Sequence, residues 1–487
     1  MGPRHRQSRA AKEPEVSGGF RSRSTHGDRP KKKPAAKKPA APKPADVDVD
    51  AARRAAFDTL RRVHGDGAYA NLTLPKLLRE RKIRDRDAAF ATEITYGTLR
   101  LTGNVDAVIA ECSSRPLAEI APEALDALRL GTYQLLHTRV DAHAAVDTSV
   151  RLVDYAGLPQ AKGFVNGILR TVSRTPAQAW AEKLTPQDPT AALAYTTAHP
   201  EWIVRSFAAA LGDDEQLRDA LAADSERPAV HLSARPGEIS AEELALITGG
   251  TEGQYSPYAV YLDGGDPGQL EPVKSQLAAV QDEGSQLIAR ALTKAEVAND
   301  AGRWLDLCAG PGGKAALLGA LARIERAHVD AVEISEHRAA LIENAVRGLP
   351  VTIHRADGRE PGLEEGYDRV LVDAPCSGLG ALRRRPEARW RKQESDITEL
   401  NELQYELLRS ALRLVRPGGV VVYSTCSPDL RETRGVVDRV VGERLAVEED
   451  ARGLVEPMTD VGAGPSVQMW PHRHGTDAMF FALLRKP

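Results

Sequence analysis

The sequence of 487 residues contains no apolar run long enough to cross a membrane, and no apolar segment typical of a secretion signal lies near its amino terminus. It contains only four cysteines, too few for a disulfide framework in a chain of this length. We therefore expect a cytoplasmic protein that makes no membrane contact. We also expect no bound metal ion.

Charge is distributed unevenly along the chain. Residues 1–45 hold 13 Lys and Arg residues against three acidic residues, a net charge of +10, whereas the rest of the chain carries −13. This segment is rich in proline and poor in large apolar residues, so it cannot bury enough surface to fold. We predict a disordered basic tail over residues 1–48. The tail could hold RNA through phosphate contacts or serve as a solvated, solubilising segment.

From Ala51 to about Ser173, apolar residues recur at spacings of three and four, as in Ala56, Leu60 and Val63. This spacing predicts about seven helices packed in one bundle. We place this all-α domain at residues 49–175 and a helical connector at 176–225. The periodicity by itself assigns no function, because most of these residues are expected in the core.

The next segment, residues 226–275, predicts a small α+β module. Two short alternating stretches, 228–234 and 258–262, predict strands, and 241–248 predicts a helix between them. A helix is expected at 280–287, at the junction with the last domain. The strands lack the paired aromatic motif that stacks bases in RNA-binding sheets, which argues against direct base recognition here.

The stretch Trp304-Leu-Asp-Leu-Cys-Ala-Gly-Pro-Gly-Gly-Lys314 predicts a strand that ends at Asp306, a glycine turn, and a helix. Its spacing matches neither the dinucleotide nor the P-loop phosphate motif. Glu333 and Asp357 then end two further predicted strands, where one carboxylate can accept ribose hydroxyls and the other can meet an adenine edge. The pattern favours S-adenosylmethionine over a dinucleotide.

Two cysteines follow the next predicted strands. The strand 367–373 ends at Asp373 and leads to Cys376, and the strand 420–426 ends at Cys426. Both thiols are thus expected at the edge that holds the glycine turn, whereas Cys112 and Cys308 are expected to be inert small apolar residues. A thiolate that adds to C6 of cytosine makes C5 nucleophilic, so that C5 can accept a methyl group.

Further residues suit this chemistry. Asp373 is placed to hydrogen-bond the cytosine N3 and N4 positions, with Lys314 as its charge partner, and the base must be unpaired or flipped out. The spacing does not choose which thiol attacks. A basic stretch after Cys376 could clamp RNA phosphates and stack a base, although a solvated loop is the alternative. Its residues are Arg383, Arg384, Arg385, Arg389, Trp390 and Arg391.

Three stretches of the front domain, 87–100, 128–136 and 162–170, resemble the NusB RNA-binding domain. The combination of Asp306-x-Cys-Ala-Gly-Pro-Gly-Gly-Lys314, Asp373-Ala-Pro-Cys-Ser-Gly378 and Ser424-Thr-Cys-Ser427 resembles the NusB/Sun/Nop family of RNA cytosine-5 methyltransferases. The resemblance is closest to the bacterial group that acts on small-subunit ribosomal RNA. It implies a multi-domain chain, in which a Rossmann-like α/β methyltransferase domain over residues 276–487 follows the helical bundle and a reduced RNA-recognition-type module.

The resemblance also implies roles for particular residues. Cys426 would be the nucleophile and Cys376 would help to release the product. The implied contacts for S-adenosylmethionine are Cys308, Ala309, Gly310, Pro311, Gly312, Gly313, Lys314, Glu333, Asp357 and Asp373.

The implied substrate is one cytidine of small-subunit (16S) ribosomal RNA, in naked RNA or in an early assembly intermediate. Two alternatives stay open: transfer RNA or large-subunit RNA as the substrate, and a non-catalytic NusB-like RNA-binding factor. Amino-group methylation is disfavoured, because that chemistry usually shows an Asn/Asp-Pro-Pro-aromatic loop where this chain has Asp-Ala-Pro-Cys. One chain contains a complete site, so we expect a monomer.

Overall fold

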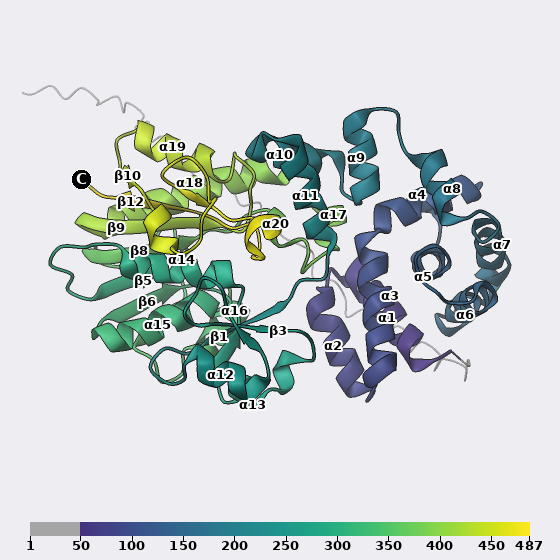
Figure 1. The fold of residues 1–487 in the computed structure, drawn as a ribbon, viewed down its shortest axis with the longest axis horizontal. Coiled ribbons are helices and arrows are strands. Elements are labelled where there is room, and N and C mark those ends of the chain that lie inside the picture. The colour runs from purple at the N-terminus through teal and green to yellow at the C-terminus, as the bar shows by residue number, and fades with distance from the viewer. Residues whose placement is uncertain (1–48) are drawn as a thin grey trace, which may run out of the picture. The chain divides into compact units, whose positions relative to one another are not determined.

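The computed structural model describes residues 49–487, and the predicted basic tail lies outside them (Figure 1). The first part of this range is a bundle of seven α-helices, as the spacing predicts, whose apolar faces form a main core and a smaller cluster that includes Leu74 and Ile83. Asp50 and Asp141 cap two of the helices by accepting backbone N–H groups. The helices are α1 (Ala51–Asp66), α2 (Ala70–Glu80), α3 (Asp85–Arg100), α4 (Thr102–Cys112), α5 (Pro122–His137), α6 (Ala142–Tyr155) and α7 (Lys162–Val172).

Four further helices follow the bundle. They are α8 (Ala177–Leu184), α9 (Pro189–Thr197), α10 (Glu201–Leu211) and α11 (Asp214–Ser225). Helices α10 and α11 are separated by Gly212, which ends α10 in the left-handed region at φ +65°, and by Asp213, which caps α11. These four helices lie between the bundle and the small α+β module along the chain.

The small α+β module contains four antiparallel strands in the order β2-β3-β1-β4. Leu232, Val260 and Leu244 pack one face of this sheet against helix α12, which begins with a capping box from Ser240 and Glu243. The elements are β1 (Val230–Ala234), α12 (Ala241–Thr248), β2 (Thr251–Glu252), β3 (Ala259–Leu262), α13 (Glu271–Lys274) and β4 (Ala278–Val280).

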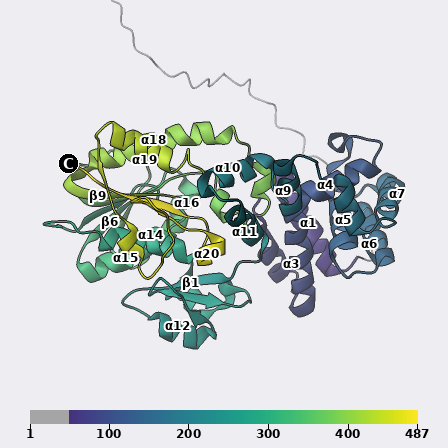
Figure 2. The same ribbon diagram turned by 45° about the horizontal axis from the view of Figure 1, so that its top comes forward.

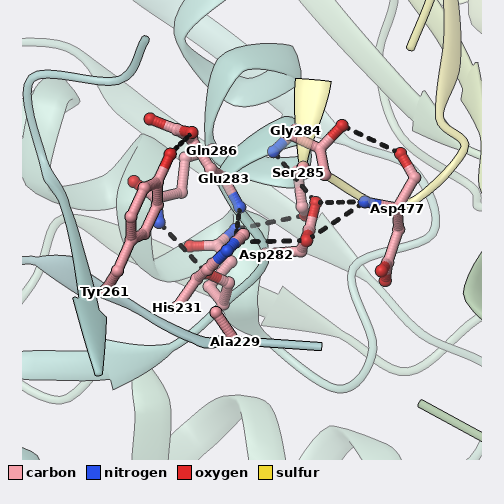
Figure 3. Close-up of polar contacts among 12 residues, drawn as sticks. Ala229, His231, Tyr261, Asp282, Glu283, Gly284, Ser285, Gln286 and Asp477 are labelled. Atoms are coloured by element: carbon pink, nitrogen blue, oxygen red, sulfur yellow. Dashed lines mark hydrogen bonds and ion pairs between the residues drawn. The ribbon is translucent and has the colours of Figure 1, made fainter. Parts of the chain in front are cut away.

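Helix α14 (Glu283–Lys294) covers the other face of this small sheet (Figure 3). The Glu283 backbone N–H donates to His231 Nδ1 at 3.1 Å, and the Tyr261 hydroxyl donates to the Glu283 carboxylate. The Gln286 side chain donates to the Leu232 carbonyl at 3.1 Å. The rings of His231 and Tyr261 lie on this covered face, so they are not presented to a base. The junction helix starts at Glu283, three residues later than expected, because Val280 belongs to β4.

The last part of the chain is built on a mixed sheet in the order β10-β12-β9-β8-β5-β6-β7, with β11 paired to β12. Strands β5 to β9 are parallel, and β12 runs antiparallel to β9. The strands are β5 (Arg303–Asp306), β6 (His328–Val332), β7 (Val351–His354), β8 (Tyr367–Asp373), β9 (Val415–Thr425), β10 (Val447–Glu449), β11 (Val467–Gln468) and β12 (Phe480–Arg485).

Helices cover both faces of this sheet (Figure 2). Helices α14 and α15 pack one face through residues such as Leu287 and Leu318, and α18 and α19 pack the other through residues such as Leu408 and Val437. The remaining helices are α15 (Gly313–Glu325), α16 (Glu336–Ala345), α17 (Ala388–Arg391), α18 (Asp396–Leu414), α19 (Arg434–Gly442) and α20 (Pro471–His474).

The main departure from the predicted strands concerns β7. This strand ends at His354, so Asp357 lies three residues further along, in a loop rather than at the strand tip. The carboxyl-terminal strands β10 to β12 are not predicted by the sequence patterns above, and β12 supplies the antiparallel neighbour of β9. Within residues 49–487, no helix is both long and apolar enough to cross a membrane.

Candidate active site

The candidate site lies at the carboxyl edge of the parallel strands. Asp306 ends β5, Glu333 follows β6, Asp373 ends β8 and Cys426 follows β9. Because these strands are parallel neighbours, their carboxyl ends share one edge of the sheet. The structure therefore brings three of the predicted site residues, Glu333, Asp373 and Cys426, to the same place, beside Asp306.

The two predicted reactive thiols face each other. The Sγ atoms of Cys376 and Cys426 lie 3.3 Å apart. Backbone hydrogen bonds fix this arrangement: the Ala374 N–H donates to the Ser424 carbonyl, and the Gly380 N–H donates to the Cys426 carbonyl, each at 2.9 Å. The loop after β8 is thus held against the end of β9.

The two thiols differ in acidity. The hydrogen bond from Cys376 is the main cause that lowers the pKa of Cys426, and the positive charge of Lys314 adds to it. The same hydrogen bond, followed by burial, raises the pKa of Cys376 well above its ordinary value. A thiolate is the nucleophilic form of cysteine, so a lowered pKa favours nucleophilic reactivity at Cys426. The contact between the two Sγ atoms is itself symmetric, since either thiol can donate in it.

Lys314 and Asp373 form an ion pair beside these thiols, in which the lysine is buried and the carboxylate is partly exposed. Lys314 Nζ lies 2.8 Å from Asp373 Oδ2, and the Ser424 hydroxyl donates to Asp373 Oδ1 at 3.0 Å. Lys314 lies in the first turn of α15, and Asp373 ends β8, so the pair joins the glycine turn to the thiol-bearing strand tips. This matches the charge partnership expected from the sequence.

The glycine turn approaches the residues after β6 closely. A Cβ atom at Gly310 would lie 2.1 Å from Glu333 Oε2, so a larger residue would displace that carboxylate. Arg338 forms an ion pair with Glu333 at 3.3 Å and also donates to the Gly310 carbonyl. At Gly312, φ is +113° and the backbone packs on Ile342.

Asp306 offers a test of whether a cationic cofactor suits this edge. Its side chain is fully buried, and neither carboxylate oxygen has a hydrogen-bond partner within the described chain. Burial, followed by the charge of Asp373, raises the pKa of Asp306 to about 7. The ammonium group of S-adenosylmethionine is a partner of the type that such an orphaned carboxylate lacks, so these residues fit that cofactor.

Asp357 has a different environment. Its carboxylate is bound by the guanidinium of Arg359, with Nε 3.1 Å from Oδ1 and an Nη atom 2.6 Å from Oδ2. These hydrogen bonds are the main cause that lowers the pKa of Asp357. Arg359 also reaches Glu406 on α18 at 3.0 Å. An adenine contact by Asp357 stays a prediction.

Most of the predicted RNA-binding side chains are engaged inside the chain. Arg383 and Arg384 both donate to the Asp477 carboxylate, and Arg384 also reaches Asp282 at 2.8 Å. Fully buried Arg389 donates to the backbone and side chain of Asp224. These arginines therefore do not form the free phosphate clamp that their spacing suggests, because carboxylates distant in the sequence pair with them.

The remaining members of this stretch contact the helical bundle. The Trp390 Nε1–H donates to the Leu99 carbonyl at 3.0 Å, and Arg391 donates to the Ala68 carbonyl at 3.0 Å. Arg385 is exposed, and its guanidinium carbon lies 4.9 Å from the centre of the Tyr69 ring. Of the six side chains, Arg385 is the one that stays most available to RNA.

Sequence reasoning missed three acids that shape the site. Glu432 contacts the loop that bears Cys376, and Asp282 and Asp477 hold the arginines that follow it. Asp282 and Asp477 are also joined directly, since the Asp477 backbone N–H donates to the Asp282 carboxylate (Figure 3). None of them belongs to a local periodic pattern. Only the position of Glu432 six residues after Cys426 could have drawn attention to it.

The fold and this edge together define an α/β methyltransferase-type domain, with a glycine turn after the first strand, acids at the following strand tips and two facing thiols. Residues 293–485 match the family model described as 16S rRNA methyltransferase RsmB/F, and residues 50–174 match the NusB family. The chain belongs to the RsmB/F family of methyltransferases and carries a NusB-family domain in front. The predicted family and multi-domain fold class are thereby confirmed.

Relatives match over nearly their whole length. The chain is 57% identical over 443 residues to "Putative methyltransferase Rv1407" of Mycobacterium tuberculosis, covering 90% of this chain and 97% of that protein. It is 33% identical to "Ribosomal RNA small subunit methyltransferase B" of Enterobacter sp., covering 89% and 98%.

Solved structures share the fold. The crystal structure of PH0851 has a TM-score of 0.79 at 22% identity and covers 90% of this chain and 98% of that chain. The structure of NSun6 from Pyrococcus horikoshii with SFG has a TM-score of 0.51 at 18% identity and covers 59% and 98%. At these identities the similarity supports the fold alone.

Proposed function

We propose that this protein transfers a methyl group from S-adenosylmethionine to C5 of one cytidine in small-subunit ribosomal RNA, through a covalent bond between Cys426 and C6. The observation that carries the proposal is the pair of facing thiols, Cys376 and Cys426, 3.3 Å apart at the edge that holds the glycine turn. Other base methylations that need no covalent adduct have no use for two thiols at this position.

Cys426 has the role of nucleophile. Its thiolate forms a bond to C6, which breaks the aromaticity of the ring and makes C5 nucleophilic. S-adenosylmethionine, when bound, supplies the electrophilic methyl group that C5 takes. Cys376 assists the release step: its thiol gives up its proton to solvent once Cys426 is bonded to C6, and the thiolate accepts the C5 proton. The electron pair left at C5 restores the C5–C6 double bond as the bond between Cys426 Sγ and C6 breaks and Sγ leaves as a thiolate. The division of acidity between the thiols, with the pKa of Cys426 lowered and that of Cys376 raised, supports these roles.

Asp373 and Lys314 orient and stabilise the base. Asp373 would hydrogen-bond the N3 and N4 edge of cytosine, where charge changes as the adduct forms. Lys314, 2.8 Å from Asp373, would hold the carboxylate in place and offset negative charge at the thiols. A base that presents this edge and C6 together must be unpaired or flipped out of a helix.

The cofactor would be held by the glycine turn and the acids around it. Residues 308–314 would line its methionine part, Glu333 its ribose hydroxyls and Asp357 its adenine. The close approach of Gly310 to Glu333 and the unpaired carboxylate of Asp306 support this placement. Arg338 would have to yield at least part of its contact with Glu333 when the ribose binds.

The choice of small-subunit ribosomal RNA follows from the family and from the relative named for that substrate, 33% identical along 98% of its length. The NusB-family domain adds a second RNA-binding element. Transfer RNA or large-subunit RNA would use the same chemistry. A binding factor without activity is the less favoured alternative, because it would have no need for Asp373, Cys376 and Cys426 together. A complete site within one chain supports a monomer.

The test is a trapping experiment. Purified Cys376→Ala and Cys426→Ala variants are incubated with unmodified small-subunit ribosomal RNA and methyl-labelled S-adenosylmethionine, then separated on a denaturing gel. A covalent protein–RNA band with Cys376→Ala and none with Cys426→Ala is expected. The reverse pattern would exchange the thiol roles, and absence of both band and label transfer in the wild type would overturn the proposed substrate.

A further inference from the structure

Glu432 is a buried acid that the proposed chemistry leaves without a role. It lies between β9 and α19, and its side chain is fully buried. One carboxylate oxygen, Oε1, accepts from the Ser377 N–H at 2.8 Å and from the Gln404 side chain at 3.0 Å. The other oxygen accepts from the Ser377 hydroxyl. The carboxylate is thus directed at the residue that follows Cys376.

No ion pair joins Glu432 to a lysine or arginine within residues 49–487. A buried carboxylate without a cation is costly unless hydrogen bonds satisfy it. Here Ser377 and Gln404 supply three such bonds. The carboxylate is therefore held next to the Cys376 loop by hydrogen bonds and not by an ion pair with a described lysine or arginine.

The contacts of Glu432 bracket Cys376 on both sides. Gln404, which donates to Glu432, also donates to the Pro375 carbonyl at 2.9 Å. Residues 375 and 377 are therefore both fixed by the same pair of side chains. The Tyr423 hydroxyl donates to the Glu432 carbonyl at 2.7 Å, which ties this acid to β9, the strand that ends beside Cys426. Glu432 thereby links the two segments that carry the thiols.

We propose that Glu432 is a positioning residue for Cys376: through Ser377 and Gln404 it holds the Pro-Cys-Ser loop so that the two thiols face each other. The inference rests on the proposed function, since it explains why Cys376 would serve in release and not in attack. Glu432 itself contacts neither thiol in the hydrogen-bond network and acts through Ser377 and Gln404.

The groups around the two thiols support this division. Cys376 faces Cys426, Glu432 and Asp373, and all three act to raise its pKa together with burial, the hydrogen bond to Cys426 being the largest cause. Cys426 faces Asp373 and Asp477, but it also faces the cation of Lys314, which acts to lower its pKa. Buried Tyr423 is the remaining titratable neighbour of Cys376. Asp373 thus acts on both thiols, whereas Glu432 acts on Cys376 and Lys314 acts on Cys426.

The first test compares Glu432→Gln with Glu432→Asp and with the control Glu402→Gln, an exposed acid on α18. Turnover and covalent protein–RNA complex are measured with the full-length protein. For Glu432→Gln we expect kcat to fall at least about tenfold with little change in the RNA KM, while the covalent complex accumulates. Glu432→Asp should recover part of the turnover. Loss of complex formation in parallel with turnover, or unchanged kinetics, would overturn the proposal.

The second test does not depend on methyl transfer. The rate at which iodoacetamide alkylates Cys376 is followed against pH by mass spectrometry, in a Cys426→Ala background with and without Glu432→Gln. Loss of the charge should move the midpoint about one pH unit lower. An unchanged or higher midpoint would overturn the charge effect. If the alkylation midpoint moves to lower pH but the wild-type protein methylates no RNA, the proposed effect of Glu432 on Cys376 is supported and the proposed function is wrong.

If Glu432→Gln lacks a thermal unfolding transition, Ser377→Ala tests the same loop, because it removes the hydroxyl that donates to Glu432. A smaller accumulation of covalent complex, with the RNA KM unchanged, is then expected. Normal turnover without accumulation in a folded Ser377→Ala protein would count against the proposal.

Discussion

Lys314 Nζ lies 2.8 Å from Asp373 Oδ2, and this one ion pair connects the cofactor turn with the strand tip that faces the thiols. Burial acts to lower the pKa of Lys314, but the carboxylate of Asp373 outweighs it and the pKa is raised. Lys314 thus stays cationic at neutral pH. Its charge also acts to lower the pKa of Cys426, so one side chain pairs with Asp373 and affects the acidity of a thiol.

We predict that Lys314→Met raises the pKa of Cys426 and thereby moves the pH profile of activity. Without the cation, the pKa of Cys426 rises, and less thiolate is present at neutral pH. We expect kcat/KM to fall about 100-fold and the pH at which activity is half-maximal to move upward. The pH–rate profile measures this, with exposed Lys294→Met as the control. A profile that keeps its position would show that Lys314 does not tune this thiol.

The ionised carboxylate of Asp306 should lower the stability of the protein, although the proposed cofactor site needs it. Its folded pKa of about 7 lies above the ordinary value of 3.8. The folded state therefore holds this proton more tightly than the unfolded state, so stability is lost as the pH rises from about 4 through about 7. The buried, unpaired carboxylate destabilises the protein most above that range.

At pH 8, Asp306→Asn should therefore have a free energy of unfolding up to about 4 kcal/mol higher than that of the wild type, since each pKa unit corresponds to about 1.4 kcal/mol. It should accordingly unfold at a higher denaturant concentration. The gain should shrink toward pH 5. Under the proposed function, the same substitution should also weaken S-adenosylmethionine binding in equilibrium dialysis, because it removes the carboxylate that would face the ammonium group of the cofactor. A gain of equal size at both pH values would show that the charge is not its cause.

The sequence predicts the parts of the site that follow from parallel strands. Asp306, Glu333 and Asp373 are expected at one edge because each follows a recognisable strand, and the ends of parallel neighbours meet there. The expected position of Asp357 at a strand tip is wrong because β7 stops at His354, where its pairing with β6 ends. Strand ends of this kind depend on the neighbouring strand and not on local pattern.

The contacts of the arginine stretch could not be predicted in the same way. Arg383 and Arg384 are paired with Asp477, more than 90 residues away, and Arg389 with Asp224, 165 residues away. Spacing along the chain carries no information on such partners. A run of arginines beside a catalytic loop looks the same in the sequence whether it faces RNA or carboxylates.

Arg384 and Arg385 are adjacent in the sequence but differ in their surroundings, and substitution of each should affect a different property. Arg384 bridges the buried carboxylates of Asp282 and Asp477, whereas Arg385 is exposed over Tyr69. Arg384→Ala leaves two buried acids with one cation fewer, so we expect a loss of about 3 kcal/mol in the free energy of unfolding. Arg385→Ala should change that free energy by less than about 0.5 kcal/mol.

RNA binding should be affected more by Arg385→Ala than by Arg384→Ala. If Arg385 contacts a phosphate, Arg385→Ala raises the RNA KM and reduces the slope of log affinity against log salt by about one, because one counterion fewer is released. Urea unfolding and a salt series of RNA binding on both variants, with the wild type as reference, measure the two effects. A folded Arg384→Ala protein with full stability and a reduced salt slope would show that Arg384 leaves its acids to bind RNA. An unchanged slope in Arg385→Ala would remove Arg385 from the RNA contact surface.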